Sequence, residues 1–104
     1  MNKLQLNNLK LKTFTEQDAL DYCLLNNINP NNIIELYLQD NKLTDISGIK
    51  IFKNLEILFL SNNRIKDISI IQYLNNLKTL WIDGNKIKDI LILRNLNNFK
   101  ELIY

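Results

Sequence analysis

Few residues in this sequence could carry out catalysis or hold a metal ion. There is no histidine, which removes the commonest general base and metal ligand. The only cysteine is Cys23, which we interpret as a buried, inert thiol in a protein of a reducing compartment. The two glycines, Gly48 and Gly84, form no phosphate-binding loop, and Asp83 and the other carboxylates are too regularly spaced to predict a paired acid and base. The sequence therefore predicts a protein that is not an enzyme, with no cofactor and no metal site.

Three aromatic residues have a spacing that suggests binding instead. Tyr37, Phe59 and Trp81 follow one another at intervals of 22 residues, and Ile103 comes after the next such interval. Large aromatic side chains contribute much of the binding energy in protein interfaces. Whether these four can act together depends on the elements that carry them.

The same interval of 22 residues governs the apolar residues of the chain from position 33 onward. Equivalent positions hold Ile33, Leu55, Leu77 and Phe99; Leu36, Leu58, Leu80 and Leu102; Leu38, Leu60, Ile82 and Tyr104; Asn41, Asn63 and Asn85; Leu43, Ile65 and Ile87; the Asp-Ile pairs at 45–46, 67–68 and 89–90; Ile49, Ile71 and Leu93; and Phe52, Leu74 and Leu96. Such a register predicts a stack of similar coils.

Physical reasoning explains why these residue types recur. Leu36 and Leu38 face one side of a short strand because side chains alternate along a strand, and that side must be the core. A single coil cannot bury its own leucines, so at least three coils must stack. The repeated asparagine can donate and accept hydrogen bonds where the chain turns, and the repeated aspartate can cap the segment that follows. We expect Asn41, Asn63 and Asn85 to form a structural ladder.

The repeated pattern, written LxxLxLxxNxLxDI, resembles the leucine-rich-repeat family over residues 33–104. The repeat length and the Asp-Ile pair are similar to the internalin-like and phosphatase-regulatory-subunit-like subclass. The resemblance implies an α/β right-handed solenoid with a parallel concave β-sheet and short helical or 3₁₀ turns on the convex side. We expect one compact domain, with repeats at 33–54, 55–76 and 77–98, a partial repeat at 99–104, and an N-terminal cap over 1–32.

The cap departs from the repeat, because Ala19 stands where the ladder asparagine should be. Two alternating runs around Asn7 and Asn8 predict a hairpin or an irregular extended segment. Thr15, followed by an acidic turn, predicts a helix over about 15–26. Its expected apolar face consists of Ala19, Leu20, Cys23 and Leu24, with Leu20 and Leu24 against the first coil.

The residues between the core leucines must point outward, and there we expect the partner-binding surface. The predicted binding residues are Tyr37, Phe59, Trp81 and Ile103; the parallel column Glu35, Ile57 and Thr79 (continued by Glu101); and, from the polar surroundings, Gln39, Asp83 and Arg64. An exposed apolar strip usually marks an interaction site, although aromatic residues also stabilise a sheet by stacking across strands. The surroundings, which also include Asp40, Lys42, Asn62 and Lys86, carry both charges and suit a protein partner better than a phosphate backbone.

Charge and hydropathy narrow the class of partner. The net charge is +2, from 13 basic and 11 acidic residues that are scattered along the chain, so no basic stripe predicts direct binding of nucleic acid. No apolar stretch is long enough to cross a membrane, and polar residues interrupt the leucines of the first eight positions, so no signal peptide is expected. We therefore expect a cytoplasmic protein.

The sequence is compatible with three functions and identifies no partner. The first is a protein-binding module that acts as an adaptor or an inhibitor. The second is an inhibitor from a phage or other mobile element, aimed at a bacterial enzyme such as a CRISPR or other defence nuclease. The third is a structural oligomerisation module, because the strand that includes Leu102 and ends near Tyr104 offers an uncapped edge for a homodimer or for strand addition by a partner.

Overall fold

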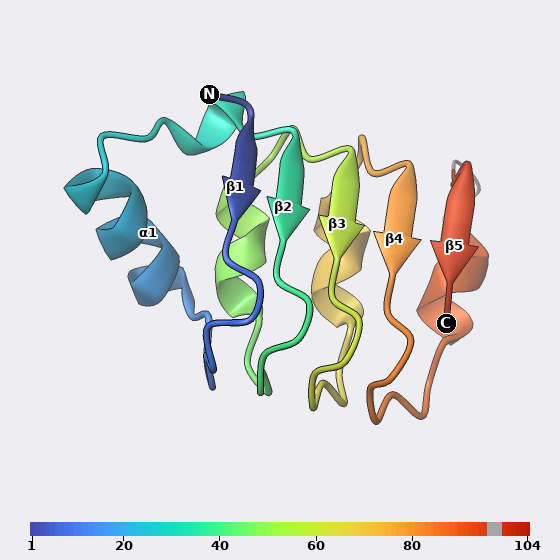
Figure 1. Cartoon of the computed structure of the whole chain (residues 1–104). Coiled ribbons are helices and arrows are strands. Elements are labelled where there is room, and N and C mark those ends of the chain that lie inside the picture. Colours follow the sequence, from blue (N-terminus) through green and yellow to red (C-terminus); the bar gives the residue numbers. More distant parts are fainter. Residues whose placement is uncertain (96–98) are drawn as a thin grey trace.

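The computed structural model describes residues 1–95 and 99–104, so the predicted core position Leu96 lies outside the described residues. Figure 1 shows the strands side by side in one sheet, with the helical elements behind them. The strands are β1 (Lys3–Gln5), β2 (Glu35–Tyr37), β3 (Ile57–Phe59), β4 (Thr79–Trp81) and β5 (Glu101–Ile103). The helical elements are α1 (Glu16–Leu25) and the 3₁₀ turns η1 (Pro30–Asn32), η2 (Ser47–Ile51), η3 (Ser69–Tyr73) and η4 (Leu91–Asn95).

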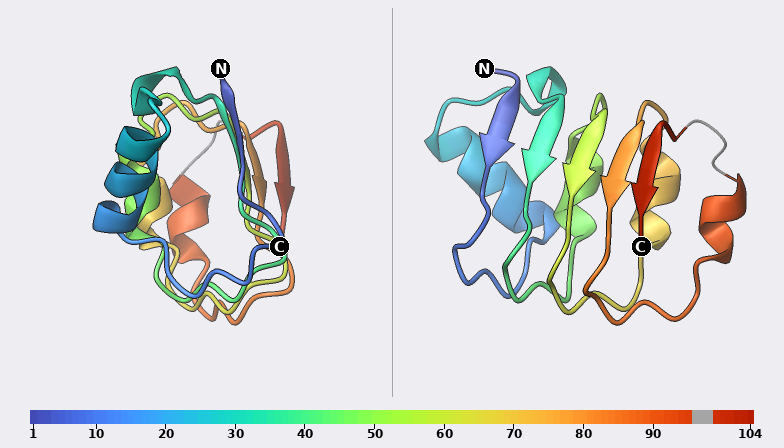
Figure 2. Two further views of the ribbon diagram at one scale, coloured as in Figure 1. Left: turned by 60° about the vertical axis from the view of Figure 1, so that its left-hand side comes forward. Right: turned by 45° about the vertical axis from the view of Figure 1, so that its right-hand side comes forward.

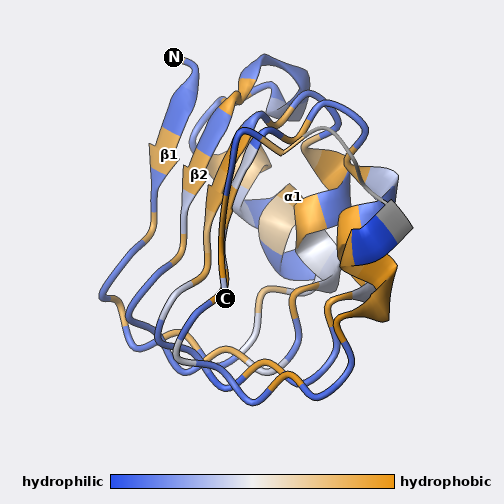
Figure 3. Ribbon diagram, turned by 90° about the vertical axis from the view of Figure 1, so that its right-hand side faces the viewer, coloured by the Kyte–Doolittle hydropathy of each residue, from blue (hydrophilic) through white to orange (hydrophobic). Residues whose placement is uncertain are grey.

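All neighbouring strands pair in parallel, in the order β1-β2-β3-β4-β5. Seen along the stack, the sheet forms one wall and the helical elements form the opposite wall (Figures 2 and 3). A parallel strand can return to the sheet only through a crossover, which here is the rest of each coil. This arrangement confirms the predicted solenoid with a parallel sheet and short 3₁₀ turns.

The core lies between the two walls and is built from the repeated apolar positions. Leu36, Leu58 and Leu80, at the centres of successive strands, are fully buried, as are Leu38 and Leu60 just beyond their strands. The residues on either side of each central leucine are partly exposed. The prediction that the leucines face inward is therefore confirmed, and their neighbours must face the solvent.

Each repeated asparagine bonds its own coil to the preceding one. Asn63 Oδ1 accepts a hydrogen bond from the backbone N–H of Leu43 at 3.0 Å, and Asn63 Nδ2 donates to the carbonyl oxygens of Leu38 and Leu60, each at 3.0 Å. Asn41 and Asn85 make equivalent bonds. These contacts fix the relative position of neighbouring coils, and thus the register of the outward side chains.

The N-terminal strand is where the structure differs most from expectation. β1 pairs in parallel with β2, with Leu4 beside Leu36, so the expected hairpin is wrong. The equivalent positions lie 32 residues apart instead of 22, because α1 needs a longer stretch of chain than a 3₁₀ turn. The first coil therefore adds a fifth strand to the sheet.

Helix α1 begins with a capping box and rests on η2 through a narrow face. The Thr15 side chain accepts from the backbone N–H of Asp18, and the Asp18 carboxylate accepts from the backbone N–H of Thr15. Ala19 and Cys23 are buried, whereas Leu20 is 43% exposed and Leu24 is 83% exposed. The expectation that Leu20 and Leu24 meet the first coil is therefore wrong, because only one pair of small residues, four positions apart, fits against the coil.

Candidate functional site

The outward side of the five-stranded sheet, which we call the sheet face, carries a continuous row of large side chains. Strand register places Tyr37 beside Phe59, Phe59 beside Trp81, and Trp81 beside Ile103. The centroids of the Tyr37 and Phe59 rings lie 4.9 Å apart in an edge-on arrangement, and those of Phe59 and Trp81 lie 4.3 Å apart at 35°. We call Tyr37, Phe59 and Trp81 the aromatic row.

The row is both stacked and open to solvent. Its three aromatic residues are partly exposed, and Ile103 at its end is 39% exposed. Stacking across strands contributes about 0.2–1 kcal/mol per pair, so the rings do help the sheet. Stacking alone, however, leaves part of each ring facing water.

One side of the aromatic row is bordered by the column that contains Glu35, Ile57, Thr79 and Glu101. The Tyr37 hydroxyl donates to Glu35 Oε1 at 2.8 Å, and this bond, together with burial and the carboxylate charge, raises the pKa of Tyr37 above its ordinary value. At the other end, Trp81 Nε1 donates to Glu101 Oε1. Both carboxylates are thereby held next to aromatic rings.

The other side of the row is bordered by Gln39, Ser61 and Asp83, which follow β2, β3 and β4. The Ser61 hydroxyl donates to Asp83 Oδ1. Gln39 Oε1 is buried and accepts no hydrogen bond from any residue that the structure describes. Of this column, Gln39 and Asp83 are partly exposed, whereas Ser61 is buried.

Three residues of the sheet face were missed by reasoning from the sequence. Ser61 could have been found, because it lies 22 residues from both Gln39 and Asp83. Lys3 and Gln5 could not, because β1 joins the sheet at a different interval. Lys3 places its ammonium group 5.6 Å from the centroid of the Tyr37 ring, within the range of a cation–π contact.

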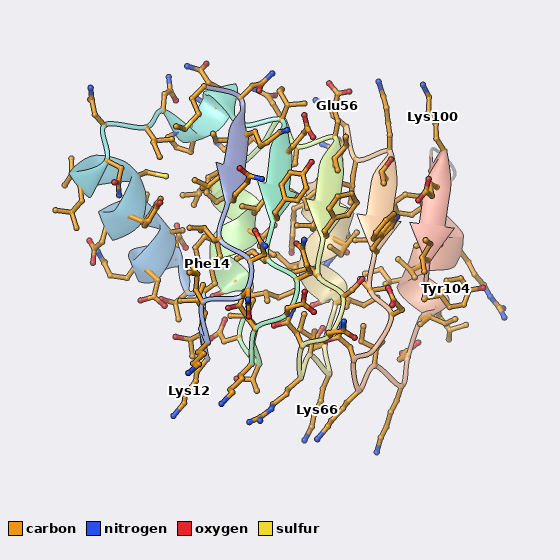
Figure 4. All side chains as sticks on the ribbon, viewed as in Figure 1. Lys12, Phe14, Glu56, Lys66, Lys100 and Tyr104 are labelled. Atoms are coloured by element: carbon orange, nitrogen blue, oxygen red, sulfur yellow. The ribbon has the colours of Figure 1, made fainter. Side chains whose placement is uncertain are left out.

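Arg64 lies apart from the other predicted binding residues, in the turn after β3. Its backbone N–H donates to Leu43, as the N–H of Lys42 donates to Leu11 and that of Lys86 to Ile65, so these turns stack like the strands. The turns carry seven exposed basic side chains in two columns, which we call the loop edge: Lys10, Lys42, Arg64 and Lys86, and Lys12, Lys66 and Lys88. Figure 4 shows Lys12 and Lys66 extending from this edge. Basic residues that are scattered in the sequence are thus gathered in space.

The described residues contain no group of three or more His, Cys, Asp or Glu side chains that could hold a metal ion. Across residues 1–95 and 99–104, no helix has the length and apolar character needed to cross a membrane. The buried Cys23 contacts the core, away from the sheet face, and burial raises the pKa of its thiol.

The repeat geometry agrees with a comparison of sequences. A family model described as leucine-rich repeats (2 copies) matches residues 31–73 and 53–101, which together make up more than half of the chain. The chain belongs to the leucine-rich-repeat family. Leucine-rich repeats are typically protein-binding modules without enzymatic activity.

Solved structures place this leucine-rich-repeat protein in the same subclass as predicted. Among 37 chains that match is internalin C2 from Listeria monocytogenes, with 25% sequence identity and a TM-score of 0.61. The match covers 97% of this chain and 50% of that chain, so this chain spans about half the length of that internalin. No curated protein sequence matches significantly. The predicted internalin-like leucine-rich-repeat family is thus confirmed.

Proposed function

We propose that this leucine-rich-repeat protein binds a protein partner through its sheet face, and that it acts as an adaptor or an inhibitor. The observation that carries the proposal is the aromatic row, in which three partly exposed rings and Ile103 form one apolar surface across four strands. Folding requires the leucines behind these rings to be apolar, but it does not require the rings themselves. Contiguous apolar surface of this kind usually marks an interaction site.

The surroundings of the row support a protein as the partner. Polar groups border it on both sides, which is the usual arrangement of an apolar interface centre within a polar rim. The carboxylates of Glu35, Asp83 and Glu101 on this face would repel the phosphates of a nucleic acid. The strands themselves are rigidly positioned by the asparagine ladder, so little ordering is needed on binding.

Site-specific photo-crosslinking in a native lysate tests this proposal. A crosslinker placed at Phe59 should capture a partner that unlabelled wild-type protein displaces. The matched control is Tyr73, an aromatic residue of η3 that is 62% exposed on the opposite wall. Capture from position 73 that equals or exceeds capture from position 59 would show that the sheet face is not the binding surface.

Activity measurements then separate the adaptor from the inhibitor. If the captured partner is an enzyme, such as a defence nuclease targeted by a mobile element, an inhibitor should suppress its activity in a one-to-one mixture. An adaptor should leave the activity intact and recover a second component. Substituting Phe59→Ser and Trp81→Ser should remove either effect, since both depend on the same row.

A second candidate function is oligomerisation through β5, which pairs with β4 among the described strands. Ile103 and Tyr104 are 39% and 69% exposed there, and Leu102 is only partly buried, unlike its fully buried equivalents Leu36 and Leu58. An open strand edge can pair with another chain. Light scattering over a dilution series would support this function if a dimer dissociates on dilution, and a monomer at every concentration would exclude it.

A further inference from the structure

We propose that the sheet face recognises a cationic side chain of its partner, lysine or arginine, at a site formed by Trp81, Asp83 and Glu101. This inference rests on the proposed function, because it names the chemistry of the partner at the same face. We call these three residues the Trp81 site. Figure 4 shows side chains extending from the strands of the sheet.

The carboxylates of the Trp81 site can only accept hydrogen bonds. Glu101 accepts from Trp81 Nε1, which holds the carboxylate beside the indole ring, and Glu101 as a whole is exposed to solvent. Asp83 accepts from the Ser61 hydroxyl and is partly exposed two residues beyond Trp81 on the same side of the chain. An ammonium or guanidinium group carries several donors and no acceptor, so it matches this set of atoms.

The protein's own Lys3 shows the same combination at the opposite end of the aromatic row. Its ammonium lies 5.6 Å from the centroid of the Tyr37 ring, and Lys3 pairs in register with Glu35, whose carboxylate accepts from the Tyr37 hydroxyl. The cation there lies near the aromatic ring, and the ring in turn is hydrogen-bonded to a carboxylate, although the described residues form no ion pair between Lys3 and Glu35. Trp81 and Glu101 also combine a ring with a carboxylate bonded to it, here contributed by the neighbouring strand, and the described residues supply no cation to them.

The charge distribution favours a cation at this place over an anion. Lys3 is the only basic residue in the three outward columns of the sheet face, while Glu35, Asp83 and Glu101 are acidic. The seven basic residues of the loop edge lie beyond the strands, in the turns. A cation close to an indole face is attracted by the ring quadrupole, and neighbouring carboxylates add to that attraction.

Fluorescence of Trp81, the single tryptophan, reports directly on this site. Three short synthetic peptides serve as probes: each has a central Leu-Phe pair, flanked by arginine in one, glutamine in the second and glutamate in the third. We expect the arginine peptide to bind about tenfold more tightly than the glutamine peptide at low salt, and the glutamate peptide to bind most weakly. The preference should shrink between about 20 and 300 mM NaCl, because salt screens exposed charges.

Matched variants distinguish this inference from the proposed function. In Asp83→Asn/Glu101→Gln, the amide oxygens still accept from Ser61 and Trp81, so the fold is preserved while the preference for arginine should disappear. Asp21→Asn, on the exposed side of α1, should keep that preference. Equal binding of all three peptides to the wild type would overturn the cation site but leave the sheet face as a docking surface. If no peptide binds, the cation site is also overturned, and crosslinking at Phe59 alone decides the proposed function.

Discussion

Gly48 lies directly against the backbone of Thr15. Its N–H donates to the carbonyl oxygen of Phe14 at 2.7 Å, and a Cβ atom at position 48 would collide with the carbonyl oxygens of both Phe14 and Thr15. The equivalent positions in the next coils hold Ile70 and Ile92, and within residues 1–95 and 99–104 no α-helix packs against them. Position 48 is therefore a glycine because the segment that leads into α1 approaches it closely, and not because a turn requires it.

Gly48→Ala should consequently destabilise the protein, by about 1–3 kcal/mol, since overpacking against fixed backbone forces the helix away. Chemical denaturation measures the loss. Gly84→Asn is the comparison variant. Gly84 has a φ of +71°, Asn8 and Asn62 adopt +56° and +59° at the equivalent positions, and the atom nearest to a Cβ there is the Asn62 side-chain oxygen, which can move, instead of fixed backbone. A larger loss for Gly84→Asn than for Gly48→Ala would contradict this account.

Asn63→Ala should be among the most damaging substitutions on the ladder. It would leave the N–H of Leu43 and the carbonyl oxygen of Leu38 without their partner in a buried place, at about 1–3 kcal/mol for each group. Asn85→Ala should cost less, because its hydrogen bonds are only partly buried. Equilibrium unfolding of the two variants, with the exposed Asn76→Ala for reference, would refute the ladder argument if all three lost the same stability.

Asp18 should make the stability of the protein depend on acid pH. Hydrogen bonds from the Thr15 backbone, the Thr15 side chain and the Thr13 hydroxyl hold the pKa of Asp18 below its ordinary 3.8. Because the pKa is depressed in the folded state, this stabilisation is fully present above pH 3.8 and is lost as the pH falls through the folded value. The effect should be modest, since the carboxylate is exposed. From neutral to acid pH, the thermal unfolding temperature should change less for Asp18→Asn than for wild type. An equal change in both proteins would contradict this role of Asp18.

Thiol reactivity should distinguish neighbouring residues of α1. Cys23 is 4% exposed and burial raises the pKa of its thiol, so a disulfide reagent should react with it only after denaturation. In the variant Cys23→Ala/Leu24→Cys, the new thiol takes the place of a side chain that is 83% exposed and should react at once. Fast reaction of native Cys23 would mean that the helix presents a different side to the coil.

Reasoning from the sequence succeeded where the structure repeats. The interval of 22 residues placed Leu36, Leu58 and Leu80 in the core and Tyr37 beside Phe59, because every coil from β2 onward has the same length. The same interval did not predict the first coil, which is longer than the others. The pairing of Leu4 with Leu36 depends on how much chain α1 occupies, and that length is not encoded in the repeat.

Two further features depend on three-dimensional proximity and could not be read along the chain. The orientation of α1, with Leu24 outward, accompanies the close approach of the Phe14–Thr15 backbone to Gly48. The hydrogen bond between Trp81 and Glu101 joins residues 20 positions apart and depends on side-chain rotamers. The role of the sheet face in binding stays a prediction, since recognition depends on a partner as well as on this chain.

The identical register of successive strand pairs has a consequence for how such a protein can change. Residues 55–76 begin and end at equivalent points of adjacent coils, so a second copy inserted after position 76 would meet matching backbone groups on both sides. Each added unit would lengthen the binding surface by about 4.8 Å while leaving the existing contacts in place. Duplication of a repeat, in evolution or by design, could therefore change the length of the binding surface while the fold stays the same.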